Sequence, residues 1–176
     1  CMTCHQGDTD YMGQIGQSVH QNLTCANCHG DIASDLDKHA EDPTEHAEAG
    51  CYSCHGDIAG IHKESIHGVS IQEGINEAAH CWDCHGSHSI TQVESEESPV
   101  HPKNLVATCG ECHDDPEFGK KFYMSVKNPA KMYSQSVHGK LLKNDSIDGP
   151  SCTDCHGIHN IKNRIQDGST ISAANL

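Results

Sequence analysis

A five-residue pattern, Cys-x-x-Cys-His, occurs six times in this chain of 176 residues and accounts for all 12 of its cysteines. The six copies are Cys1, Cys4 and His5; Cys25, Cys28 and His29; Cys51, Cys54 and His55; Cys81, Cys84 and His85; Cys109, Cys112 and His113; and Cys152, Cys155 and His156. Two thiols three residues apart on one helical turn can each bond to a vinyl group of one porphyrin, and the adjacent imidazole then lies beneath the iron. The pattern therefore predicts six covalently attached haem c groups, each with one iron.

Disulfide bridges and zinc sites are the other structures that cysteines in such numbers form. A disulfide framework is usual in small exported proteins, but it gives no reason for a histidine after every cysteine pair. Zinc would need the pairs to combine into Cys₄ or Cys₂His₂ sites, and tetrahedral coordination does not require that adjacent histidine either. A thioredoxin-like redox pair would occur once, within a βαβ pattern that this sequence lacks. Haem attachment explains every copy.

The side chains are too polar to fill an ordinary hydrophobic core. Hydrophobic residues make up 35% of the chain, with two Phe, one Trp and four Tyr, whereas roughly 45–50% is typical of globular domains. We therefore expect haem groups to fill the interior. The expected fold class is mostly irregular with short α-helices, packed around haem, with little or no β-sheet. Helical patterns cover Asp31–Glu48, Glu117–Lys127 and Ala130–Leu142, and the acidic stretch Val93–Pro102 is the expected linker.

Ten histidines lie outside the six motifs, which is enough to give every iron a second imidazole ligand. Several of them recur in the same surroundings. The segment SIHG (Ser65–Gly68) matches SVHG (Ser136–Gly139) at an offset of 71, and the same offset carries His88 to His159. A partial third copy is QSVH, which ends at His20. The recurrence indicates an internal repeat whose histidines have the same role in each copy.

The repeat divides the chain into three predicted modules, about residues 1–48, 49–98 and 99–176, each with two haem motifs. Because a haem shared across a boundary would join both sides, we expect one hexahaem domain that covers residues 1–176. We predict five distal ligands from the recurring surroundings: His20, His67, His88, His138 and His159. For the sixth iron His39 and His46 compete, with His39 preferred, and His80 or His101 are the alternatives. His62 is expected at the surface or near a haem propionate.

The pattern Ser-Val-His-Gly followed by Cys-x-x-Cys-His-Gly-x-His resembles the multihaem c-type cytochromes of anaerobic respiration, and the resemblance extends over nearly the whole chain. It implies close-packed haems, each iron bound by two histidines. The first module departs from this pattern, because no Gly follows His20 and Ile32 stands where the His of Cys-His-Gly-x-His would be. Some relatives polymerise into extracellular cytochrome filaments, in which one subunit supplies an axial histidine to the next.

Irons bound on both faces by imidazole cannot bind a substrate, so the sequence favours an electron carrier over an enzyme. We expect electron transfer through six haems by the subunit of an extracellular filament, and a soluble periplasmic carrier is the alternative form. A reductase of nitrite, hydroxylamine or a sulfur oxyanion is the other alternative. Such an enzyme would need one haem with an open position on its iron.

Charge is distributed unevenly along the chain. Residues 1–100 carry a net charge of −15 and residues 101–176 one of +1, which together make −14. So acidic a chain is not expected to bind nucleic acid, and no apolar run approaches the roughly 20 residues that span a bilayer. The expected partners are other redox proteins or copies of the chain itself, joined head to tail. Thioether attachment is typical of exported proteins, so we expect a processed chain that is extracellular or periplasmic.

Overall fold

The computed structural model describes residues 1, 5, 7, 9–41, 49–143 and 149–175, and within them it contains short helices and no β-strand. The elements are α1 (Thr9–Gln17), α2 (Cys25–Cys28), α3 (Gly30–Ser34), α4 (Leu36–Glu41), the 3₁₀ helix η1 (Cys51–Ser53), α5 (Gly56–Lys63), α6 (Ile66–Gln72), α7 (Cys81–His85), α8 (Leu105–His113), α9 (Pro116–Lys121), α10 (Pro129–Gln135), α11 (Val137–Lys143) and α12 (Cys152–His156). The longest, α1 and α8, have nine residues each. The predicted fold class of short helices without a sheet is confirmed.

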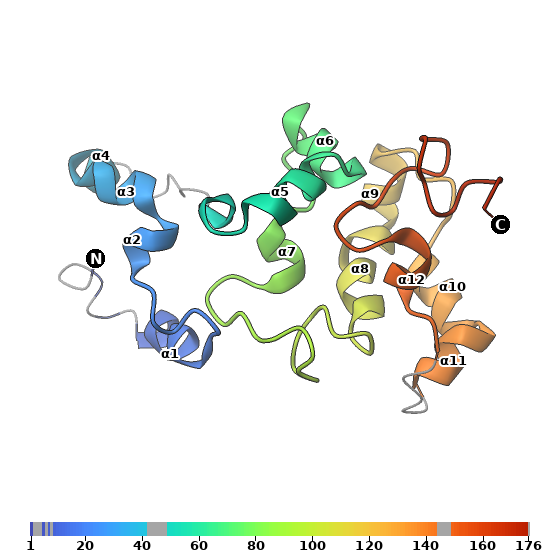
Figure 1. Cartoon of the computed structure of the whole chain (residues 1–176), viewed down its shortest axis with the longest axis horizontal. Coiled ribbons are helices and arrows are strands. Elements are labelled where there is room, and N and C mark those ends of the chain that lie inside the picture. The colour runs from blue at the N-terminus through green and yellow to red at the C-terminus, as the bar shows by residue number, and fades with distance from the viewer. Residues whose placement is uncertain (2–4, 6, 8, 42–48, 144–148, 176) are drawn as a thin grey trace.

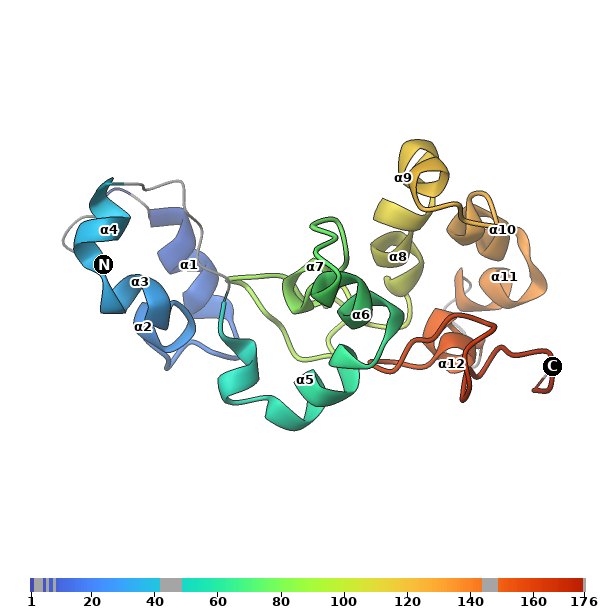
Figure 2. The ribbon, with the colours of Figure 1, turned by 90° about the horizontal axis from the view of Figure 1, so that it is seen from above.

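The molecule is elongated, with its two ends formed by opposite ends of the sequence. Helices α1 to α4 lie at one end, α5 to α7 in the middle, and α8 to α12 at the other end (Figures 1 and 2). The N- and C-termini consequently lie far apart along the long axis. Among the described residues, no helix is long and apolar enough to cross a membrane.

The polypeptide has almost no core of its own. Among the residues that the structure describes, the buried apolar side chains are Ala78, Leu105, Ala130 and Leu142, and the largest side chains that are fully buried are three serines. The chain exposes 12418 Å², whereas a compact protein of 19.0 kDa exposes about 8,400 Å². Side chains alone therefore do not close the interior, in agreement with the low hydrophobic content of the sequence.

Half of the motifs begin a helix that is capped from within the motif. The residue before the second cysteine accepts a hydrogen bond from the backbone N–H three positions earlier, in the pairs Asn27 and Thr24 (2.8 Å), Asp83 and His80 (2.7 Å), and Asp154 and Ser151 (2.6 Å). This half of a capping box stabilises the first turn and holds both cysteines on it. The third motif instead begins the 3₁₀ helix η1, and the fifth motif ends α8.

A tight corner between two helices occurs twice, and it explains the glycine that follows the recurring Ser-x-His. A Cβ at Gly68 would lie 2.1 Å from the carbonyl oxygen of His62, and one at Gly139 would lie 2.2 Å from that of Tyr133. Only glycine allows α6 to approach the end of α5 so closely, and α11 the end of α10. Tyr133 lies 71 residues after His62, and Gly139 lies 71 residues after Gly68, as the repeat requires.

The three predicted helical stretches form, but each is shorter or interrupted. Residues 31–48 contain α3 and α4, which are separated at Asp35, and residues 42–48 lie outside the described part of the chain. Helix α9 ends at Lys121, because Tyr123 adopts a φ of 51° that a helix cannot contain. Residues 130–142 form α10 and α11 with Ser136 between them in extended backbone. The expected linker, residues 93–102, contains no helix.

Candidate haem-binding sites

Five motif histidines each face one histidine from outside the motifs, at nearly the same separation. The ring centres are 6.2 Å apart in His5 and His39, 6.0 Å in His55 and His20, 6.2 Å in His29 and His88, 6.2 Å in His113 and His67, and 6.0 Å in His85 and His159. All five outer histidines are among the ligands that the sequence predicts. The pairing itself, which joins residues up to 74 positions apart in sequence, was not predicted.

This separation fits a metal between the two rings. Two imidazoles that bind one metal from opposite sides, with metal–nitrogen bonds of about 2.0 Å, place their ring centres about 6.2 Å apart. Two other ring pairs lie closer, namely the stacked pair His80 and Trp82 at 4.4 Å and the edge contact of Tyr11 and His88 at 4.9 Å, whereas His113 and Phe118 lie at 6.3 Å. The residues therefore fit a haem iron with two axial histidines. Tyr11, on α1, is a neighbour of this candidate site that no sequence signal identified.

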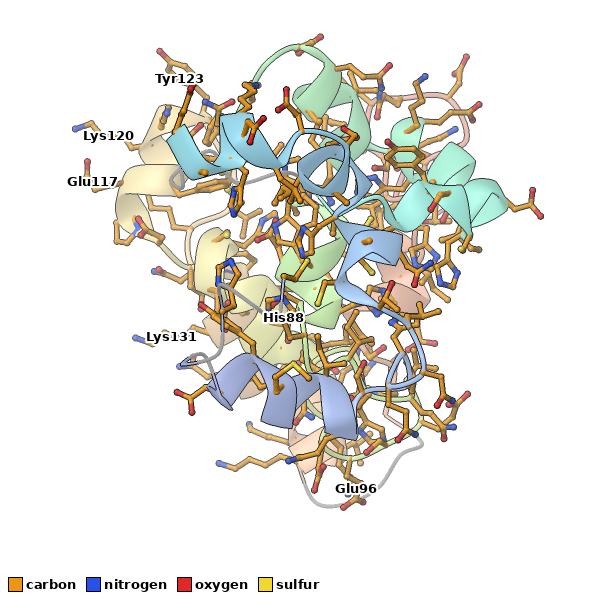
Figure 3. The ribbon with its side chains drawn as sticks, turned by 90° about the vertical axis from the view of Figure 1, so that its left-hand side faces the viewer. His88, Glu96, Glu117, Lys120, Tyr123 and Lys131 are labelled. Carbon is orange, nitrogen blue, oxygen red and sulfur yellow. The ribbon has the colours of Figure 1, made fainter. Side chains whose placement is uncertain are left out.

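Four of the five pairs cross the predicted module boundaries. His20 and His29, in residues 1–48, face His55 and His88 in residues 49–98. In the same way, His67 and His85 face residues of the third module. Figure 3 views the molecule from the end that holds α1 to α4, and His88 lies above α1 in that view, inside the outline of the molecule. Each boundary is therefore bridged by two pairs.

Burial favours the neutral, metal-binding form of five of the paired histidines. Burial and, to a lesser extent, the nearby charges of His113 and His62 together lower the pKa of His67 to about 4. Burial likewise lowers the pKa of His85, His88, His113 and His159, in each case as the main cause. A neutral imidazole nitrogen has the lone pair that a metal ligand needs. At neutral pH these side chains are therefore ready to coordinate iron.

The cysteines of consecutive motifs lie beside one another. Burial raises the pKa of the Cys28 thiol, and the neighbouring thiols of Cys51 and Cys54 raise it further. The effect means that these thiols lie within electrostatic range of one another. Burial is also the largest cause of the raised thiol pKa of Cys51 and of Cys84. The neighbouring thiol of Cys81 raises that of Cys51 further, and the thiol of Cys112 raises that of Cys84 further.

The last two motifs are joined by a direct contact. A hydrogen bond to Cys152 raises the pKa of the Cys109 thiol, and burial adds to this effect. Backbone atoms also connect neighbouring motifs, because the N–H of Gly50, just before the third motif, donates to the Cys28 carbonyl at 2.9 Å. Motifs two to six thus form an unbroken series of neighbours along the molecule.

The sixth motif lacks the paired arrangement. His156 and the predicted distal ligand His138 are both exposed, and neither faces another histidine ring at that spacing within the described residues. The other candidates have different contacts. His62 Nε2 donates to the Ala79 carbonyl at 3.2 Å, and His101 Nδ1 accepts from the Lys103 N–H at 3.3 Å. His46 lies outside the described residues.

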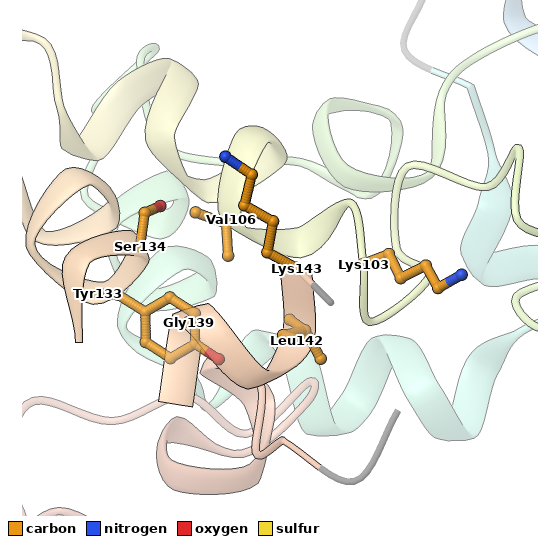
Figure 4. Close-up of a pocket in the computed structure, with 7 residues that line it drawn as sticks. All are labelled: Lys103, Val106, Tyr133, Ser134, Gly139, Leu142 and Lys143. Atoms are coloured by element: carbon orange, nitrogen blue, oxygen red, sulfur yellow. The ribbon is translucent and has the colours of Figure 1, made fainter. Parts of the chain in front are cut away.

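Two hollows mark the surface. One, of about 310 Å³, lies at the third motif and is lined by residues 54–58, which include Cys54 and His55. The other, of about 290 Å³, lies between α8, α10 and α11 and contains no motif residue (Figure 4). Its lining includes Tyr133 and Ser134 of α10 and Lys143 of α11. In the described part of the chain, no three His, Cys, Asp or Glu side chains are placed to bind a metal ion directly.

Comparison with known proteins gives one family. A family model described as cytochrome c3 matches residues 17–114, which is more than half of the chain. The match begins just before the first Ser-x-His segment and ends one residue after His113, so it includes motifs two to five. No curated protein and no solved structure matches the chain.

Proposed function

The chain belongs to the cytochrome c3 family, whose members carry covalently bound haem c and transfer electrons, and we propose that it conducts electrons through six such groups, one at each Cys-x-x-Cys-His. Each haem c supplies a one-electron Fe(III)/Fe(II) couple. The polypeptide holds consecutive groups close together, closes both axial positions of each iron and limits the access of water.

We assign the axial ligands from the five facing pairs. They are His5 with His39, His29 with His88, His55 with His20, His85 with His159, and His113 with His67. The separations of 6.0–6.2 Å between ring centres support this assignment. For the sixth iron we assign His156, with His138 as the remaining candidate for its second ligand. The pairs that bridge the module boundaries support a single hexahaem domain.

The observation that carries the proposal is the unbroken series of motif contacts. Because each cysteine bonds to the edge of its own haem, neighbouring cysteines imply neighbouring haem edges. The contacts of Cys28 with Cys51, Cys51 with Cys81, Cys84 with Cys112, and Cys109 with Cys152 follow the order of motifs two to six. A carrier for one electron would not need such a series, whereas a conductor does.

An electron carrier is favoured over a reductase. A ligand on both faces leaves an iron no position for nitrite, hydroxylamine or a sulfur oxyanion. The test is an EPR-monitored redox titration of the purified protein. We expect about six electrons per chain and low-spin signals only. A high-spin signal from about one iron in six, together with turnover of one of these substrates, would favour the reductase instead.

We further propose that copies of the chain associate head to tail as an extracellular filament. Three observations support it. The termini lie at opposite ends of an elongated molecule (Figure 1), and the acidic and neutral halves of the sequence lie toward those ends. The third Ser-x-His segment is exposed at one end, with Val137 72% accessible, whereas the first two are engaged within the chain.

A soluble periplasmic carrier is the other form that an exported electron conductor can take. Sedimentation at neutral pH in low and high salt separates the two forms. Large assemblies in low salt support the filament. A monodisperse 19 kDa polypeptide with its haems, in every salt condition, supports the carrier.

A further inference from the structure

Ser18 connects two chain segments that each carry a proposed distal ligand. Its hydroxyl donates to the carbonyl of Ile90 at 3.1 Å and accepts from the N–H of His20, also at 3.1 Å. The N–H of Val19 donates to the same Ile90 carbonyl at 2.8 Å. Ser18 is only 2% exposed, so water does not compete for these bonds. We call this contact the first joint.

A second joint further along the molecule has the corresponding backbone bond, with a serine that caps its own helix in place of the bridging hydroxyl. The N–H of Ile66 donates to the carbonyl of Ile161 at 2.8 Å. Ser65 is fully buried, and its hydroxyl accepts from the N–H of Gly68 at 3.1 Å. Ile90 and Ile161 are 71 residues apart, and each lies two residues after a proposed ligand, His88 or His159. Because the contact with the isoleucine carbonyl recurs at the offset of the repeat, chance does not explain it.

Each joint lies between ligands of two different irons. At the first joint His20 faces His55 and His88 faces His29, so the irons of the second and third motifs are involved. Two residues of chain span at most about 7 Å, so neither ligand can move independently of the joint. At the second joint the irons are those of the fourth and fifth motifs.

We propose that Ser18 and Ser65 are positioning residues: Ser18 holds the distal histidines of two neighbouring haems in a fixed mutual orientation, and Ser65 fixes the first turn of α6, which carries His67. This inference rests on the proposed ligand pairs. It goes beyond them, because it assigns the orientation of two axial rings to one contact between modules. The bridging hydroxyl of Ser18 has the greater role, since it bonds both to the ligand's own backbone and to the segment that carries the second ligand.

The test compares haem-loaded variants with altered hydroxyls. In Ser18→Ala we expect six haems and no high-spin iron, but shifted low-spin EPR g-values and reduction potentials for about two of the six haems, because g-values follow the angle between the axial imidazole planes. Ser18→Thr, which keeps the hydroxyl, should restore both. Ser95→Ala is the matched control, because the Ser95 hydroxyl accepts only from the nearby Glu97 N–H in the described residues and should change neither.

Ser65→Ala removes the hydroxyl that caps the first turn of α6 and should shift the haem of the fifth motif, whose motif histidine faces His67. If Ser18→Ala does not assemble, Ser65→Ala decides the matter. Unchanged g-values and potentials in an assembled serine variant would overturn the inference and leave the proposed function intact. In contrast, fewer than six haems or singly ligated iron in the unaltered protein would overturn the proposed function itself.

Discussion

Replacement of His159 by alanine removes one ring of a pair that the proposed ligand assignment places on the fourth iron. His159 faces His85 with ring centres 6.0 Å apart and an angle of 20° between the ring planes. Alanine cannot bind iron, so His85 would remain as the only protein ligand. With six motifs in the chain, about one sixth, or roughly 17%, of the iron should become high-spin while the rest stays low-spin.

One side chain that could replace the lost ligand is His62, whose charge adds to the effect of burial in lowering the pKa of His159. Its Nε2 already donates to the Ala79 carbonyl at 3.2 Å, so we expect it to stay in place. His159→Met provides a second measurement. It keeps six ligands on the iron and should raise the reduction potential of one haem without any high-spin signal.

EPR of the oxidised protein, with integration of the high-spin and low-spin signals, measures this outcome. His80→Ala is the control, because that ring stacks on Trp82 at 4.4 Å and faces no motif histidine among the described residues. It should leave all iron low-spin. Fully low-spin iron in His159→Ala, or high-spin iron in His80→Ala, would refute the reasoning that ring separation identifies the ligands.

Three other changes test separate parts of the structure. His39→Ala should produce one high-spin iron and His46→Ala none, because the His39 ring faces His5 at 6.2 Å. EPR of the two variants shows which histidine is the ligand, and the reverse result would assign that role to His46. Gly68→Ala should lower the unfolding free energy by roughly 1–3 kcal/mol, since the added carbon would lie 2.1 Å from a carbonyl oxygen at the end of α5. Gly60→Ala is the control, because a carbon added there has nothing within 4 Å. Equal thermal stability of the two variants would contradict the tight corner. Head-to-tail assembly should weaken as the salt concentration rises, because it would join the acidic half of one copy to the neutral, lysine-containing half of the next. Assemblies that sediment in the same way at every salt concentration would exclude charge as their cause.

The sequence predicted local features better than long-range ones. Cys-x-x-Cys-His implied short helices, and the capping by Asn27, Asp83 and Asp154 shows why they form where they do. The glycine after Ser-x-His was noted as part of a repeat, and its cause is the close approach of a preceding helix. Both features depend on residues near in sequence, which is why a pattern reveals them.

The pairing of histidines depends on contacts that a local pattern does not contain. His20 faces His55, and His67 faces His113, because backbone bonds such as Val19 to Ile90 bring distant segments together. The isoleucines of these joints recur at the repeat offset, so a signal was present, but an apolar residue gives no indication that its carbonyl is the functional group. The predicted helix over residues 130–142 is interrupted for a related reason, since the corner at Ser136 serves the packing of α11 on α10.

The central claim is that porphyrins, attached at every motif, replace the missing core of side chains. Mass spectrometry of the intact, denatured protein tests it most directly, because thioether bonds survive denaturation. The account predicts a single species of the 19.0 kDa polypeptide with six haems added. A mass with fewer haems, or one in which the cysteines are joined as disulfides, would contradict it.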